Sequence, residues 1–329
     1  MRQICTILIL LISLSIPAQT INEPSPIEWD GYTQLRFTSN LGTVNRFSVR
    51  RMKLWINSAP GLSEHWGFHI QANYKSYPNE IFSLQDVLVY YQNGRFRLNM
   101  GQFIPHYSLE QFQRDFFLPL TERAEVIISL IPNGTLGLRD IGLEANYISR
   151  NECFKSWLGL FNGSGIKEYR LKNFGILLTH KTEFTLPERH FSAGYSVMYR
   201  KADQLKLQNI LPDTTRFTGN DLRYNLYTKY STKRTEIQAE YLLASLNGTT
   251  ASGWYLLAHV NIGKNQLAVS WNQYTDLISE TNSFPEVHLG YNYKINGDNL
   301  KLMLDNKINV AKGELKNYFV TIQLQLSFN

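Results

Sequence analysis

The sequence predicts an all-β protein, a transmembrane antiparallel β-barrel of about 16 strands. Three observations predict this fold class. The chain begins with an export signal and has no later apolar run long enough for a membrane-spanning helix. It then divides into segments of roughly 10 to 13 residues in which apolar and polar side chains alternate, as in strands that cross a bilayer. The connections between these segments are alternately short and long, which is typical of outer-membrane barrels.

The first residues have the pattern of a secretory signal. Arg2 supplies the charged start, residues 4–16 form an apolar run, and Ala18 is a small residue suited to the cleavage position. This run is too short to span a bilayer as a helix, so we expect an exported protein that crosses a membrane only through strands. The predicted organisation is a signal peptide at residues 1–18, a short N-terminal segment at 19–28 and a single barrel domain at 29–329.

Cysteine and aromatic content narrow the class further. Cys5 lies in the signal and Cys153 is then alone, so neither a disulfide framework nor a cysteine metal cluster is expected. Aromatic residues make up 13% of the chain and include 19 Tyr. Tyr and Trp are favoured where an apolar surface meets water, as in the girdles of membrane barrels. We expect no cofactor, because no Gly-rich phosphate loop and no Cys/His ligand spacing occurs, and no nucleic-acid partner.

Sixteen alternating segments are predicted, and an even number returns both ends of the chain to one side of the membrane. Their expected starts are Trp29, Arg46, Glu64, Ser83, Arg95, Gly137, Cys153, Leu171, Arg189, Gly219, Lys233, Ser252, Asn265, Phe284, Asp298 and Lys316. Every second connection is short, such as Asn93-Gly94, and Asn-Gly pairs are strong hairpin signals because both residues tolerate a positive φ. The intervening connections are mostly longer, notably residues 103–136 and 202–218.

The closing segment alternates most strictly. One face carries only apolar side chains and the other only uncharged polar ones. The apolar set is Val320, Ile322, Leu324, Leu326 and Phe328, and the polar set is Thr321, Gln323, Gln325 and Ser327. In a soluble sandwich the apolar face would meet a second sheet, whereas in a membrane barrel it would meet lipid. The charged polar faces of other segments favour a lumen, and Phe328 is then expected to signal barrel insertion, one residue before Asn329.

Many basic side chains occupy the polar faces. Those expected to face the lumen are Arg51, Lys53, Lys75, Arg95, Arg97, Lys181, Arg200, Arg223, Lys229, Lys294, Lys301 and Lys307. Acidic candidates on the same faces are Asp86, Glu144, Glu183, Glu240 and Asp305. One interpretation is a mixed-charge wall that hydrates a channel. The other is a low-affinity path for anions, because rings of Arg and Lys give anion and phosphate pores their preference.

The connection over residues 103–136 is too long and too apolar for an ordinary exposed loop. Its apolar residues include Phe112, Phe116, Phe117, Leu118, Leu120 and the run at 126–131. We expect this connection to fold into the barrel and form a constriction. Charged candidates within it are Glu110, Arg114, Asp115, Glu122, Arg123 and Glu125. The alternative for Glu122 and Arg123 is an internal salt bridge that fixes the loop.

No catalytic or metal site can be assembled from the spacing of residues. His65 and His69 would stand about 13 Å apart on a strand, so their rings cannot share an ion. The other histidines have no neighbouring pattern that suggests a nucleophile and a base. We therefore expect a protein that is not an enzyme, and an outer-membrane lipase or protease is the least favoured alternative.

Three stretches in order carry a family resemblance. They are residues 50–57, residues 101–110, and Glu122-Arg123 followed by residues 139–142. Over residues 46–145 the chain resembles the phosphate-selective porin O and P family of Gram-negative outer membranes. The resemblance implies a sixteen-stranded barrel, usually trimeric, whose third extracellular loop folds into the pore. It also implies that arginines guide phosphate toward a constriction where lysines hold it.

Carried over by position, Arg50, Arg51 and Lys53 match the family's basic strand, and Arg123 matches its loop arginine. Ile104 departs from the pattern, because relatives commonly have a basic residue there. We expect a passive, anion-biased outer-membrane channel for small anionic solutes such as phosphate or polyphosphate, surrounded by outer-membrane lipid and assembled as a homotrimer. The main alternative is a closed barrel that serves as an adhesin or scaffold.

Overall fold

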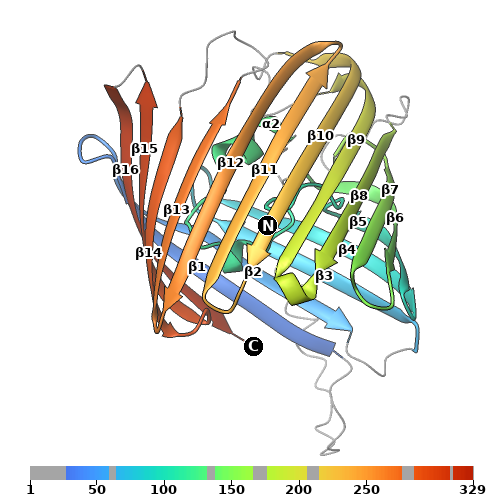
Figure 1. The fold of residues 1–329 in the computed structure, drawn as a ribbon, viewed down its shortest axis with the longest axis horizontal. Coiled ribbons are helices and arrows are strands. Elements are labelled where there is room, and N and C mark those ends of the chain that lie inside the picture. Colours follow the sequence, from blue (N-terminus) through green and yellow to red (C-terminus); the bar gives the residue numbers. More distant parts are fainter. Residues whose placement is uncertain are drawn as a thin grey trace, which may run out of the picture.

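The computed structural model describes residues 27–58, 64–131, 138–165, 176–205, 215–275, 285–311 and 314–328. The predicted signal peptide and nearly all of the segment at 19–28 lie outside these residues, as does Asn329. The described chain forms one closed antiparallel barrel in which each strand pairs with its sequence neighbours and the first strand pairs with the last (Figure 1). The predicted fold class is therefore confirmed.

Sixteen strands make the barrel, and most begin within a few residues of the expected starts. They are β1 (Ile27–Ser39), β2 (Asn45–Ser58), β3 (Trp66–Lys75), β4 (Ile81–Asn93), β5 (Phe96–Phe103), β6 (Asp140–Ile148), β7 (Phe154–Phe161), β8 (Leu177–Leu186), β9 (Phe191–Leu205), β10 (Phe217–Ser231), β11 (Thr235–Leu246), β12 (Thr249–Ile262), β13 (Asn265–Tyr274), β14 (Glu286–Asn296), β15 (Leu300–Ala311) and β16 (Glu314–Phe328). Three expected starts lie outside the described residues, those of the sixth, eighth and fourteenth segments at Gly137, Leu171 and Phe284.

The two ends of the barrel differ in their connections. The end that holds Ile27 and Phe328, here the turn end, has the short turns, whereas the opposite end, here the loop end, has most of the long connections. The tight turn at Asn247-Gly248 is an exception at the loop end. Both of its residues have a positive φ, 50° and 90°, which is the backbone that a two-residue hairpin requires.

The closing strand β16 has the two faces that its sequence predicts. Leu324 is 38% exposed on the outside of the barrel, whereas Gln325 is fully buried on the inside. At the seam, the ring of Phe328 lies directly over Gly31 of β1, where a Cβ atom would stand only 2.4 Å from the ring. A glycine at this position therefore lets the last aromatic residue pack across the joint between the first and last strands.

In the described part of the chain, three short helical elements accompany the strands. They are the 3₁₀ turns η1 (Asp115–Phe117) and η2 (Pro187–Arg189) and the helix α2 (Glu125–Leu130). Within the described residues, no helix combines the length and apolar character needed to cross a membrane.

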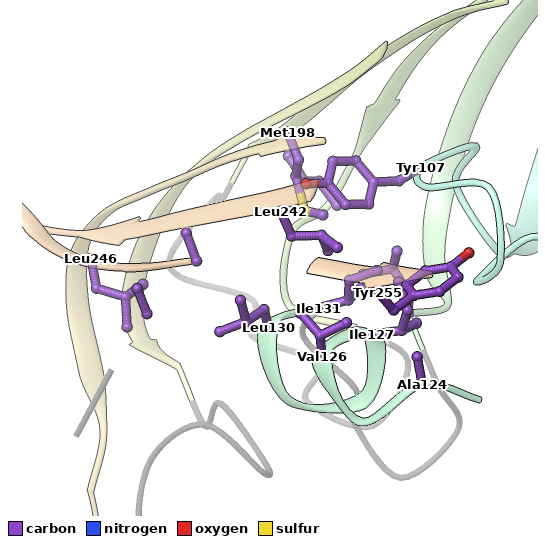
Figure 2. Packing of buried hydrophobic residues seen from close by; sticks show 14 of the residues in the cluster. Tyr107, Ala124, Val126, Ile127, Leu130, Ile131, Met198, Leu242, Leu246 and Tyr255 are labelled. Carbon is purple, nitrogen blue, oxygen red and sulfur yellow. The ribbon is translucent and has the colours of Figure 1, made fainter. Parts of the chain in front are cut away.

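The helix α2 is held by packing inside the barrel. It has six residues, too few to be stable by itself in water. Val126, Ile127 and Leu130 are almost completely buried and pack in one cluster with inward-facing side chains such as Leu242 and Tyr255 (Figure 2). Burying each such side chain contributes roughly 1.5–3 kcal/mol. The connection that carries α2 is thus fixed to the wall formed by β11, β12 and β13.

Candidate channel interior

A β-bulge in β2 turns two neighbouring arginines toward the inside of the barrel. The pairing of β1 with β2 runs from Gln34–Arg51 to Leu35–Val49, which leaves Arg50 as the extra residue. On a regular strand, adjacent side chains point to opposite faces, and a bulge removes that constraint. Arg50 and Arg51 therefore both reach the connection between β5 and β6, although the alternation alone assigns them opposite faces.

A second bulge, in β4, turns two neighbouring polar side chains toward the inside of the barrel. The pairing of β3 with β4 shifts between Gln71–Asp86 and Ala72–Leu84, which leaves Gln85 as the extra residue. Gln85 and Asp86 are both buried on the inside of the barrel. Asp86 accepts two hydrogen bonds from Arg139, at 2.7 and 3.1 Å, just before β6 begins. This paired contact ties the end of the long connection to the wall.

Ser108 anchors the beginning of the same connection. Its backbone is in the left-handed region, with φ 66°. Its Oγ donates to Glu240 of β11 at 2.8 Å, its N–H donates to Ser196 at 3.1 Å, and its carbonyl accepts from Lys181 at 2.7 Å. Each polar group of Ser108 thus has a partner on the wall, and these contacts stabilise a backbone that is costly for a non-glycine residue.

Glu240 is the centre of this anchor. Besides Ser108, its carboxylate accepts the backbone N–H groups of Leu109 at 2.9 Å and Glu110 at 2.6 Å. Asn225 and Tyr255 donate to it from neighbouring strands, both at 2.7 Å. Five donors satisfy one buried carboxylate, which makes this contact strong because it is charge-assisted and shielded from water.

The opposite wall holds the middle of the connection. Lys301 of β15 donates to the carbonyl of Phe116 at 3.0 Å, and Gln325 of β16 donates to the same oxygen at 3.1 Å. Asp305 accepts from the backbone and the hydroxyl of Thr121, at 3.0 and 2.7 Å. Residues 104–131 therefore run along the inner, polar faces of strands on both sides of the barrel.

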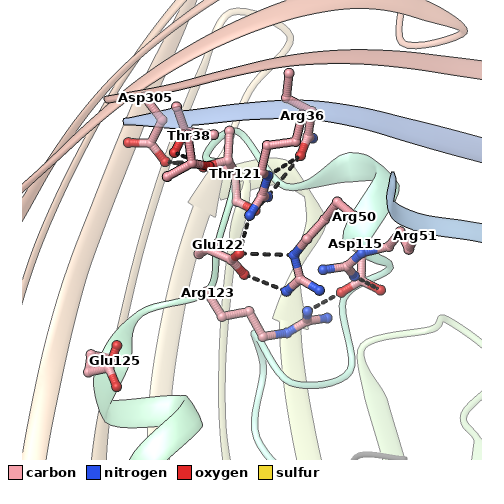
Figure 3. A network of polar contacts seen from close by, with 12 residues as sticks. Arg36, Thr38, Arg50, Arg51, Asp115, Thr121, Glu122, Arg123, Glu125 and Asp305 are labelled. Carbon is pink, nitrogen blue, oxygen red and sulfur yellow. Dashed lines mark hydrogen bonds and ion pairs between the residues drawn. The ribbon is translucent and has the colours of Figure 1, made fainter. Parts of the chain in front are cut away.

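Two carboxylates of the connection face the basic side chains of β1 and β2 (Figure 3). Glu122 pairs with Arg36 and, through two hydrogen bonds at 2.7 and 3.0 Å, with Arg50. Asp115 pairs with Arg51, with Arg123 of the connection itself, and with Lys53 at 2.8 Å.

These pairs separate the roles of Glu122 and Arg123. Glu122 joins the connection to the wall. Arg123 braces the connection internally, because it also donates to the carbonyls of Glu110 and Gln113. The sequence left two interpretations open for Glu122 and Arg123, charges of a constriction or an internal salt bridge between them. Arg123 does form an internal salt bridge, but its partner is Asp115 and not Glu122.

The acidic side chains of the connection differ in their pKa values. Burial raises the pKa of Asp115, but the facing cations Arg123, Arg51 and Lys53 hold it well below its usual range. Burial likewise opposes ionisation of Glu122, and Arg50 and Arg36 reverse the effect, so its pKa is also well below its usual range. Burial raises the pKa of Glu110 to about 7, assisted by the nearby charge of Glu240 and opposed by Arg123.

A cavity of about 1790 Å³ lies between residues 104–131 and the wall from β1 to β7. Its lining includes Glu28 and Gly94 at the turn end and Lys75 and Asn79 at the loop end. Ten Lys and Arg side chains line it against six Asp and Glu side chains, so the lining has a surplus of positive charge. The packed helix α2 occupies the other side of the barrel interior.

The predicted site residues divide into two groups. Those that line the cavity are Arg50, Arg51, Lys53, Arg95, Arg97, Arg114, Glu122 and Arg123. The others contact the connection or a neighbouring strand. Arg223 donates to the carbonyl of Leu130, and Lys301 donates to the carbonyl of Phe116. Lys307 pairs with Glu125 and Glu286, Lys229 pairs with Glu236, and Glu110 accepts a hydrogen bond from the N–H of Ala124. Arg223 and Lys301 are each 1% exposed.

Some basic residues of the interior were absent from the predicted lumen cations, and Arg36 and Arg139 are two that contact the connection or the wall. Arg36 pairs with Glu122, and Arg139 pairs with Asp86 and lines the cavity. A signal for Arg36 existed, because Tyr32, Gln34 and Arg36 share the polar face of an alternating segment. Among the described residues, no group of three or more His, Cys, Asp or Glu side chains is arranged to hold a metal ion.

The fold and the lined interior define a class, the sixteen-stranded barrel with a long inner connection after the fifth strand. Solved structures match the barrel fold of the chain. The trimer form of OmpT from Vibrio cholerae has a TM-score of 0.65 and 10% identity, with 92% of this chain and 99% of that chain covered.

Two further solved structures match the fold. Salmonella typhi OmpF, in a complex with daunomycin, has a TM-score of 0.64 and 8% identity, covering 92% of this chain and 97% of that chain. A mutant of the Rh. blastica porin has a TM-score of 0.63 and 8% identity, covering 92% and 100%. The chain thus has the fold of the general Gram-negative porins. No family model and no curated protein matches the sequence.

Proposed function

We propose that the protein is an outer-membrane porin, a passive and water-filled channel with a preference for small anions. The observation that carries this proposal is the cavity, because its lining reaches both ends of a closed barrel and contains more cations than anions. A pore lined by Arg and Lys favours anions through its summed potential. The proposed channel carries no catalytic step.

The outer surface supports a location in the outer membrane of a Gram-negative cell. Large apolar side chains such as Leu226, Leu267 and Leu302 are exposed on the outside of the barrel. A contiguous apolar outer band around a closed barrel fits lipid, since every backbone group of the closed sheet is already paired. The proposal includes cleavage of a signal peptide at residues 1–18, export, and a barrel domain at 29–329.

The connection over residues 104–131 is proposed as the constriction of this channel. It joins the wall at Glu240, at Asp305 and at Arg36 and Arg50, which leaves open the space on the side of β2 to β6. Arg50, Arg51, Lys53 and Arg123 lie at its edge but are paired with Asp115 or Glu122.

The cations left to attract solute anions directly are those outside these pairs. Arg95, Arg97 and Arg114 line the cavity, and the described residues show no ion pair for any of the three. Phosphate is the proposed finer specificity, suggested by the family resemblance of residues 46–145. A homotrimer is proposed by analogy with the trimer form of Vibrio cholerae OmpT.

Current measurements in planar bilayers test the channel. Across a potassium chloride gradient, the reversal potential should show that chloride is more permeant than potassium. Replacing Arg97, which lines the cavity, with Glu should weaken that preference, whereas the same charge reversal at Lys233, outside the cavity lining, should leave it unchanged. Clear cation selectivity of the wild-type protein would refute the anion preference, and a protein without conductance would favour the closed-barrel alternative.

A phosphate preference has its own test. Phosphate added to chloride should reduce the chloride current if it binds along the path. An equal concentration of sulfate, which has a similar size and charge, serves as the comparison. Equal effects of the two anions would limit the protein to a general anion preference.

A further inference from the structure

Two aromatic rings of the constriction remain exposed to the cavity. Phe112 is 41% exposed and Phe117 is 59% exposed, and both line the cavity inside the barrel. Their apolar neighbours on the same connection, Phe116 and Leu118, are buried. Aromatic surface exposed in a wet passage forgoes part of the stabilisation that full burial would provide. Packing within the connection covers only part of each ring, since Phe112 contacts His106 and Phe117 contacts Phe116 edge to face.

A positively charged residue, Arg114, lies between Phe112 and Phe117 in the sequence. Arg114 is exposed, lines the same cavity, and has its guanidinium carbon 5.8 Å from the ring centre of Trp55 on the facing wall. Within the described residues Arg114 has no ion pair, in contrast to Arg36, Arg50 and Arg51. Phe112 and Phe117 are two and three residues from Arg114 in the sequence, and all three side chains line the same cavity. Together they are here called the Phe112–Arg114–Phe117 face.

The facing wall repeats this chemistry. The guanidinium carbon of Arg97 lies 3.7 Å from the ring centre of Tyr90, and both residues line the cavity. On the side of the connection, the ring of Phe112 contacts His106 at 3.8 Å between ring centres, and His106 in turn stacks on Trp157. Arginine and aromatic side chains therefore face the passage from both sides.

We propose that this face is a binding site for aromatic carboxylates, so that among carboxylates the channel favours planar aromatic ones over those without a ring. An arginine fork binds a carboxylate through two parallel hydrogen bonds, and a flat ring attached to that carboxylate can stack on a phenyl ring in an offset or edge-to-face arrangement. A carboxylate without a ring can use only the first of these contacts. This proposal rests on the channel function and adds one class of organic solute to it.

The test compares three probes as blockers of the chloride current. Benzoate has the ring and the charge, acetate has only the charge, and benzyl alcohol has only the ring. Because an aromatic pair adds about 0.5–1.5 kcal/mol, the half-blocking concentration of benzoate should be roughly two- to twelvefold below that of acetate. Benzyl alcohol should block weakly, since it lacks the carboxylate.

Two substitutions locate the effect. Phe117→Leu keeps an apolar side chain but removes the ring, so it should bring benzoate close to acetate. Arg114→Gln should weaken block by both anions and leave benzyl alcohol unchanged. Both side chains are exposed, so folding should be preserved. Arg150→Gln is the matched control, because Arg150 lines the cavity at the turn end and is exposed, away from this face.

A second readout separates this proposal from the channel function. Broadening of the fluorine resonance of 4-fluorobenzoate by the detergent-solubilised barrel reports binding without conduction. A protein that conducts chloride but treats benzoate and acetate alike overturns the aromatic site and leaves the channel intact. Broadening that survives both substitutions places binding elsewhere and also overturns it. A protein that broadens the resonance through Arg114 and Phe117 but does not conduct supports the site and refutes the channel.

Discussion

The contact between Glu122 and the wall allows a quantitative prediction of ion selectivity. Glu122 pairs with both Arg36 and Arg50 at the edge of the proposed passage and offsets one of their two positive charges. The substitution Glu122→Gln removes one negative charge from the cavity lining and keeps the side-chain volume. The local potential should become more positive, so the permeability ratio of chloride to potassium should rise.

The size of this effect follows from Coulomb's law. An ion about 8 Å from the lost carboxylate gains or loses roughly 0.5 kcal/mol in water, reduced to about 0.2 kcal/mol by screening at 0.1 M salt. This shift favours the anion and disfavours the cation, so the permeability ratio should rise about twofold. At 1 M salt the change should nearly disappear, because the screening length falls to about 3 Å.

The assay is the reversal potential of the wild-type and substituted proteins in one salt gradient. Glu152→Gln is the matched control, because Glu152 lines the same cavity but lies at the exposed turn end. A ratio that stays unchanged or falls in Glu122→Gln would refute the reasoning. An equal rise in both variants would show that the lining acts as a whole and that Glu122 has no special position.

Three further predictions concern attachment of the connection and closure of the barrel. The pKa of Glu110 is raised from 4.5 to about 7, so the attached connection binds this proton more tightly than the unfolded chain does. The stabilisation that protonated Glu110 gives to attachment is therefore complete below pH 4.5 and is lost as the pH rises through 7. Amides of residues 105–124, corrected for intrinsic rates, should therefore exchange faster at pH 8 than at pH 5.5, and Glu110→Gln should remove this difference. Glu240→Ala leaves the buried backbone amides of Leu109 and Glu110 without an acceptor. At roughly 1–3 kcal/mol for each amide, it should weaken attachment of the connection by about 2–6 kcal/mol. The expected sign is faster proteolysis within residues 104–131, whereas Glu183→Ala should have a much smaller effect. Deleting Phe328 and Asn329 should greatly reduce membrane assembly, because Phe328 packs over Gly31 at the seam, and normal assembly would contradict this role.

The barrel was predictable because its signals are local. Alternation with a period of two identifies strands that separate lipid from an inner wall, and turn residues mark where each strand ends. The closing strand shows why this works, since each face of β16 is chemically uniform. The pairing order then follows from short connections between successive strands.

The inner site was less predictable because it depends on register and packing. Nothing in the local pattern indicates that Arg50 is an extra residue in β2, yet this bulge turns both Arg50 and Arg51 inward. Likewise, all basic residues of the polar faces look alike in sequence. Lys301 and Arg223 hold the connection, whereas Arg97 faces the cavity, and this difference depends on the side of the barrel against which the connection lies.

The pairing of β1 with β16 has a consequence for the life of the protein in the cell. Gly31 pairs with Phe328, so the final joint forms between residues separated by almost the entire chain. No stable cylinder can exist until the last strand has been delivered, and contacts so distant in sequence form slowly. Throughout transit the chain presents unpaired strand edges that are prone to aggregation. We therefore expect it to depend on holding chaperones between export and insertion, and to lose that dependence once its first and last strands have met.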